Sequence, residues 1–151
     1  MNYDILGLYR ENAFIKYNAA AFSKSGREED KENLLVQLVI RLKLDECGAP
    51  TPMTDTGFIL RIEPFTDDEG RQWMPLYTDL DEVFEGAPTA YTVEIPLRNL
   101  VEDAFDHDEY EGLLVNPYTD RVFLGKCELD YVLDTILRIE NGEEGGLLWK
   151  G

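Results

Sequence analysis

Short apolar segments alternate with helical patterns in the second half of the chain, and this order limits the folds that the chain can adopt. Residues 91–95 and 112–115 have the composition of strands. Between them, Pro96 suits the first turn of a helix, and apolar residues recur on one helical face from Leu97 to Phe105. This strand–helix–strand order predicts right-handed crossovers and at least partly parallel pairing.

An antiparallel hairpin is predicted ahead of these segments. Residues 57–62 and 72–77 form its arms, and residues 66–70 form its turn. Pro75 has no amide hydrogen, so part of the second arm should be unpaired on one side. The whole pattern predicts an α+β fold, in which a mixed β-sheet (the antiparallel hairpin plus short βαβ crossovers) forms a single layer of sheet packed by helices.

Glycines, prolines and other turn-forming residues predict further loops and one more strand. Gly48, Pro50 and Pro52 mark an irregular segment in front of the hairpin. Residues 116–120 predict a turn, and residues 121–124 predict a strand after it.

Helices are expected before the hairpin and after it. In an N-terminal helical region, residues 3–44, the segment 34–44 matches both a helical stripe and the alternation of a strand. The acidic residues at 28–30 suit a helix N-terminus and favour the helix. A short helix over residues 80–85, capped by Thr78 or Asp79, follows the hairpin.

A last helix precedes the C-terminal residues. It ends at Asn141 and Gly142, and a flexible tail is expected over residues 141–151 because glycines are dense there. One face of this helix carries five apolar side chains that we expect to be buried together: Leu129, Val132, Leu133, Ile136 and Leu137.

The chain carries 31 Asp and Glu residues against 14 Lys and Arg residues, which gives a formal net charge of −17. Such a field repels nucleic acids and anionic membrane surfaces, so we expect neither as a partner. It would attract a basic protein, although acidity also serves solubility alone, which is the interpretation we favour. At 151 residues, with no linker long enough to divide it, the chain is expected to form a single domain.

The two cysteines, Cys47 and Cys127, are too few for a disulfide framework and lack the spacing of a zinc or redox motif. No charged-then-apolar leader opens the chain, and no apolar segment is long enough to span a membrane. We therefore expect a cytoplasmic protein. A glycine-rich phosphate loop is also missing, so no cofactor is expected.

His107 is the single histidine and lies among carboxylates, where it could act as a general base or metal ligand. No glycine-flanked serine or activated cysteine lies near it, so we interpret it as a solvated loop residue. Asp106 and Asp108 start the spacing of a calcium loop, but Tyr110 occupies the next ligand position and the glycine comes at Gly112. We predict no catalytic, cofactor-binding or metal-binding residues.

Three segments between residues 73 and 133 resemble the N-terminal domain of the SseB family, the proteins named for enhanced serine sensitivity. They are PLYT at residues 75–78, IPLRNL at 95–100 and GLLVNP at 112–117. Asp79 stands where a serine often follows the threonine, which leaves the capping role intact. We expect no counterpart of the family's second, C-terminal domain, because the chain has no room for it.

The resemblance implies an α+β fold without established enzymatic activity. We therefore expect a non-enzymatic protein-interaction module, with a second copy of the chain as one candidate partner. The alternative is an acidic immunity protein that neutralises a basic toxin domain, because complementary charge speeds association. The hypothetical partner-binding residues are Trp73, Pro75, Tyr77, Asn116 and Tyr118, although tryptophans on strands are usually buried.

Overall fold

The computed structural model describes residues 12–44, 48–55, 60–86 and 91–142, which form the predicted α+β fold. The helices in this part of the chain are α1 (Ala13–Ser25), α2 (Glu28–Leu44), α3 (Leu80–Gly86), α4 (Leu97–Asp106) and α5 (Lys126–Glu140). The strands are β1 (Gly48–Asp55), β2 (Leu60–Ile62), β3 (Phe65–Thr66), β4 (Gln72–Leu76), β5 (Tyr91–Pro96), β6 (Tyr110–Val115) and β7 (Val122–Gly125). Residues 3–11 of the expected N-terminal helical region, residues 57–59 of the predicted hairpin arm and the tail from residue 143 onward lie outside the described residues.

The strands form two sheets, so the prediction of a single sheet is wrong. A three-stranded antiparallel sheet has the order β2-β1-β5, and a four-stranded sheet has the order β3-β4-β6-β7. In the second sheet β4 and β6 are parallel and the other pairs are antiparallel, so this sheet is mixed as predicted. The predicted parallel crossover from residues 91–95 to residues 112–115 is wrong, because β5 and β6 lie in different sheets. The difference arises because β5 pairs with β1 instead of joining the sheet that contains β6.

β1 is a strand where the sequence predicts an irregular segment. The carbonyl of Pro52 accepts a hydrogen bond from the Glu63 N–H, which lies on the β2 side, so this residue turns its polar groups away from β5. Pro50, two residues earlier, has the same orientation. Because β2 pairs with Met53 to Asp55, neither missing amide hydrogen is needed for sheet formation.

The predicted hairpin between residues 57–62 and 72–77 is wrong in its pairing. β2 pairs with β1, and the antiparallel partner of β4 is β3. Pro64 separates β2 from β3 and cannot donate to a ladder that continues through both strands. Among the described residues β3 pairs with Gln72 and Trp73 alone, so β4 is unpaired around Pro75 on that side, as predicted.

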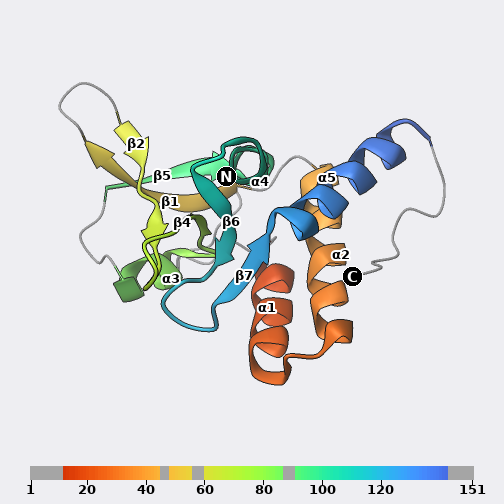
Figure 1. The fold of residues 1–151 in the computed structure, drawn as a ribbon, viewed down its shortest axis with the longest axis horizontal. Coiled ribbons are helices and arrows are strands. Elements are labelled where there is room, and N and C mark those ends of the chain that lie inside the picture. Colours follow the sequence, from red (N-terminus) through yellow and green to blue (C-terminus); the bar gives the residue numbers. More distant parts are fainter. Residues whose placement is uncertain (1–11, 45–47, 56–59, 87–90, 143–151) are drawn as a thin grey trace.

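α1, α2, α4 and α5 form a layer over one face of the four-stranded sheet (Figure 1). α1, α4 and α5 contact this sheet, and α2 packs against all three. α2 begins at Glu28 with three acidic residues in its first turn, which confirms the helix predicted there. Five apolar side chains of α2 are buried in the core: Leu34, Leu35, Leu38, Val39 and Leu42.

α5 is docked on the core, but its buried face is narrower than predicted. Leu129, Val132 and Ile136 are fully buried, and Leu133 is partly buried. Leu137 is 53% exposed, so its predicted burial is wrong. The three buried positions follow a spacing of three and four residues, and Leu137 lies one step further round the helix.

Candidate functional site

The four-stranded sheet is apolar on both faces. Alternation along β4, β6 and β7 directs every second side chain into the helical core. The side chains between them point to the opposite face, and residues directly opposite each other on paired strands share a face. Phe65 is opposite Trp73, and Leu114 is opposite both Pro75 and Phe123, so these five residues lie on the outward face.

Aromatic rings cover this outward face. Trp73 and Phe123 meet edge to face with their ring centroids 4.8 Å apart, and Phe65 meets Tyr118 in the same way at 5.8 Å. Tyr118 also stacks on Tyr77, with centroids 6.4 Å apart. We call Phe65, Trp73, Tyr77, Tyr118 and Phe123 the aromatic face.

A hollow of about 540 Å³ lies along the aromatic face. Phe65, Trp73 and Phe123 form its apolar part, and the loop of residues 67–71 contributes acidic side chains to its rim. Phe123 is 41% exposed and Tyr118 is 46% exposed, whereas Trp73 is only 8% exposed. The hollow therefore has a fixed indole at its base and accessible rings beside it.

Asp67 holds the Trp73 indole in place. The Nε1–H of Trp73 donates to Oδ2 of Asp67 at 3.0 Å, and the backbone N–H groups of Glu69 and Arg71 donate to Oδ1, each at 2.9 Å. These hydrogen bonds, above all the one from Trp73, together with the nearby Arg71 charge, lower the pKa of Asp67 to about 2. The loop of residues 67–71 is thereby tied to the sheet.

We expect Asp67 to titrate near pH 2 while the protein is folded. Its pKa is lower in the folded chain than the ordinary value of 3.8, so its contribution to stability is complete above that value and is lost as pH falls toward 2. The chemical shift of the Trp73 indole N–H, followed by NMR from pH 7 downward, should stay constant until below pH 3 and then change. Asp67→Asn should abolish that change, and a midpoint near pH 4 would contradict this assignment.

Asn116 fixes the turn that carries Tyr118. The Thr78 N–H donates to Oδ1 of Asn116 at 3.0 Å, and Nδ2 of Asn116 donates to the Thr78 hydroxyl at 3.0 Å. The Asn116 N–H donates to the Leu76 carbonyl at 2.9 Å. Asn116 has a φ of 45°, in the left-handed region that asparagine tolerates better than most residues. The turn after β6 is thus bonded to the end of β4.

α1 is tied to the start of α3 by two ion pairs from the half-buried Lys16 to buried carboxylates. Asp79 caps α3, because its Oδ1 accepts a hydrogen bond from the Glu82 N–H at 3.0 Å. Lys16 Nζ lies 2.8 Å from Asp79 Oδ2 and 3.3 Å from Glu82 Oε2. Burial lowers the pKa of Lys16, but the hydrogen bonds and charges of the two carboxylates outweigh burial and raise the pKa. Of the two residues predicted to cap α3, Asp79 is therefore the one whose side chain accepts a hydrogen bond from the first turn of the helix.

The five residues expected to bind a partner lie together, but most are covered. Trp73, Pro75, Tyr77 and Asn116 are buried, and Tyr118 alone among them is exposed. Burial also raises the pKa of Tyr77 well above its usual value, with Tyr118 and Glu63 adding to the effect. The buried residues can support a contact surface but offer little area for direct contact.

Phe65 and Phe123 belong to the aromatic face and were not expected there. Alternation along the predicted strand 121–124 could have placed Phe123 opposite to the buried Val122 and Leu124. No sequence signal indicates Phe65, because its strand has two residues and its partner lies across a turn.

The other candidate positions show no assembled site. His107 is exposed at the end of α4, 3.8 Å from Asp103 and 3.6 Å from Glu109. Within the described ranges, no three His, Cys, Asp or Glu residues are grouped so that they could hold a metal ion. Cys127 is exposed on α5, and Cys47 lies outside the described residues.

Comparison of the chain with protein-family models, with curated proteins and with solved structures finds no match. Across the four described segments, no helix has the length and apolar character to cross a membrane.

Proposed function

We propose that the chain is a non-enzymatic protein-interaction module, of the type that its resemblance to the SseB N-terminal domain implies, and that the aromatic face is its contact surface. One observation carries the proposal: aromatic rings lie exposed on the sheet face opposite the helical core. Tyr118 and Phe123 present these rings, and the buried Trp73 and Tyr77 support them.

The rings are held in place before a partner arrives. Asp67 fixes the indole of Trp73, and the hydrogen bonds of Asn116 fix the turn that leads to Tyr118. Contact surfaces between proteins owe most of their affinity to a few well-packed side chains, among which aromatic residues are enriched. Because the rings are already ordered in the free protein, binding costs little conformational entropy at these side chains, and this favours binding.

The net charge of the chain favours a basic partner, although Arg71 and Arg121 line the hollow beside its acidic residues. Asp68 and Glu69 are exposed on the rim of the hollow, and the whole chain carries a charge of −17. Such a field speeds the approach of a protein with Lys and Arg residues on its surface. An acidic immunity protein that neutralises a basic toxin domain is the form of this proposal in which charge dominates recognition.

The test is photo-crosslinking from the aromatic face in the native cell. A photoreactive phenylalanine derivative at position 118 or 123 should crosslink to one discrete protein. The matched controls are positions 17 and 91, because Tyr17 and Tyr91 are exposed aromatic residues on α1 and β5. With the captured partner purified, Phe123→Ala should weaken binding roughly ten-fold or more, and Tyr17→Ala should leave it unchanged.

Each outcome of the crosslinking bears on the proposal. Crosslinks from positions 17 and 91 but not from 118 and 123 would refute the aromatic face as the contact surface. A basic toxin domain as the captured protein would select the immunity form, and a second copy of the chain would select a homodimer.

A further inference from the structure

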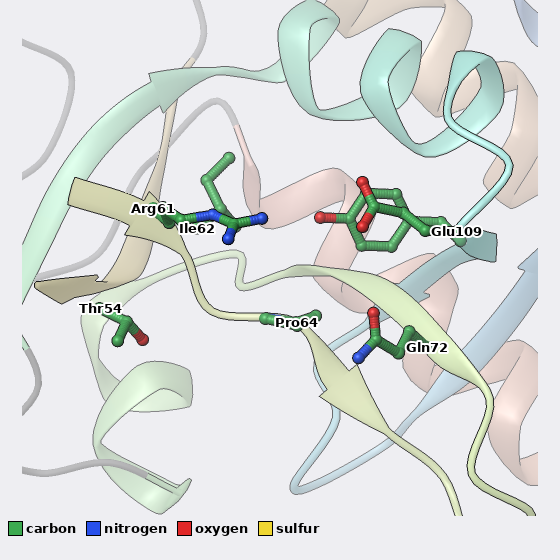
Figure 2. Close-up of a pocket in the computed structure, with 7 residues that line it drawn as sticks. Thr54, Arg61, Ile62, Pro64, Gln72 and Glu109 are labelled. Atoms are coloured by element: carbon green, nitrogen blue, oxygen red, sulfur yellow. The ribbon is translucent and has the colours of Figure 1, made fainter. Parts of the chain in front are cut away.

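A second hollow, of about 330 Å³, lies between the two sheets (Figure 2). Its walls come from β1, β2, β4 and the beginning of β6, and it shares no lining residue with the hollow along the aromatic face. Ile62 and Pro64 are its apolar residues. Five polar side chains complete the lining: Thr54, Arg61, Gln72, Glu109 and Tyr110.

Arg61 is the residue that points to a ligand. Arg27, Arg71, Arg98 and Arg138 form ion pairs with carboxylates. Arg121 donates to a backbone carbonyl, and Arg41 lies over the ring of Phe14. Arg61 alone among the described arginines forms no side-chain ion pair, hydrogen bond or ring contact with another described residue, although the chain has 31 acidic residues. Its guanidinium extends into the hollow (Figure 2).

The polar groups around Arg61 are also available. No described residue forms a hydrogen bond with the Thr54 hydroxyl, the Gln72 side chain or the Tyr110 hydroxyl. Glu109 faces Arg61 from the other side of the gap in Figure 2. Burial raises the pKa of Tyr110, the Glu109 charge adds to the effect and the Arg61 charge opposes it. Both charges therefore act on this one hydroxyl.

We propose that this hollow binds a carboxylate group, carried by a small molecule or by the C-terminus of a peptide. A guanidinium presents two parallel N–H donors that match the two oxygens of a carboxylate. Thr54, Gln72 and Tyr110 supply uncharged donors around the same space. Glu109 and the net charge of −17 disfavour a phosphate dianion, which carries more negative charge. The volume is near the lower end of the range for ligand pockets, which suits a small group.

Titration of the full chain with N-acetyl-alanyl-alanine, followed by backbone amide NMR, tests this proposal. We expect saturable shifts in β2 and at the start of β6, with a Kd on the order of 0.1–1 mM. Arg61→Gln should weaken binding roughly 10–100-fold, because charge-assisted hydrogen bonds are lost. Arg61→Lys should give an intermediate loss, since it keeps the charge without the planar fork. Lys24→Gln removes the same charge from the end of α1, distant from β2 in Figure 1, and should leave the Kd unchanged.

Further probes distinguish the source of the carboxylate and the outcomes that overturn the site. Binding of acetate as strong as that of the peptide would assign a small-molecule carboxylate, and much tighter binding of the peptide would assign a peptide C-terminus. The C-terminal amide of the same peptide should not bind. Equal binding of the amide or of inorganic phosphate, equal weakening by Lys24→Gln, or the absence of saturable shifts would overturn the proposal.

Discussion

Replacement of Ile136 by alanine should lower the free energy of unfolding by about 2–5 kcal/mol. The side chain is fully buried on α5 and packs in the core that the helices form with the four-stranded sheet. Its truncation removes apolar contacts and leaves a cavity that close-packed neighbours fill only in part. The neighbouring Leu137→Ala should change the free energy by less than about 0.5 kcal/mol, because this side chain is mostly in solvent.

Urea unfolding followed by circular dichroism measures both variants. The dependence of the free energy on urea should be unchanged, since the surface exposed on unfolding is almost the same. Equal losses for Ile136→Ala and Leu137→Ala would mean that α5 packs with a different face. A loss near zero for Ile136→Ala would mean that the helix is not docked.

Asn116→Ala should lower the free energy of unfolding by about 2–4 kcal/mol. The substitution leaves the buried Thr78 N–H without its acceptor, which costs about 1–3 kcal/mol. It also places a residue with a Cβ and no compensating side-chain hydrogen bond at a φ of 45°, at a cost of about 1–2 kcal/mol. The two costs act on the same turn and are not fully additive.

Asn116→Gly separates the two contributions. Glycine adopts the left-handed conformation without steric cost but lacks the side-chain hydrogen bonds, so the loss should be smaller than for alanine. Equal losses would attribute the whole effect to the hydrogen bonds with Thr78. No measurable loss in either variant would contradict the role that we assign to this turn.

Local patterns in the sequence predict the helices and the α+β fold. α2 is predicted correctly because its acidic first turn and its apolar stripe favour the same structure. The pairing of strands is not predicted, because it depends on contacts between distant segments. Pro50 and Pro52 indicate an irregular segment in the sequence, because a proline has no amide hydrogen to donate to a neighbouring strand. Only the fold shows that the backbone polar groups of both residues point away from β5, where no donor is needed. Alternation likewise cannot choose between β2 and β3 as the partner of β4.

The candidate site is predictable in its location but not in its exposed residues. The sequence predicts a contact surface that includes Trp73, Tyr77 and Tyr118, and these three residues do lie on one face. It cannot show that Trp73 and Tyr77 are covered by Phe123, Phe65 and Tyr118, because that cover comes from separate strands and a turn. The second hollow is similarly invisible in the sequence, since its lining comes from four strands that meet only in the folded chain.

The division into two sheets does not divide the chain into two separable units. β5 lies between β4 and β6 in the sequence, yet it pairs with β1 in the other sheet. Any continuous piece that contains all strands of one sheet therefore contains at least one strand of the other. The parallel pairing of β4 with β6 joins two strands that α3, β5 and α4 separate in the sequence. It is therefore a long-range contact, and such contacts slow folding. Truncation at either sheet would remove strands of the other, so we expect the two sheets to unfold in one transition.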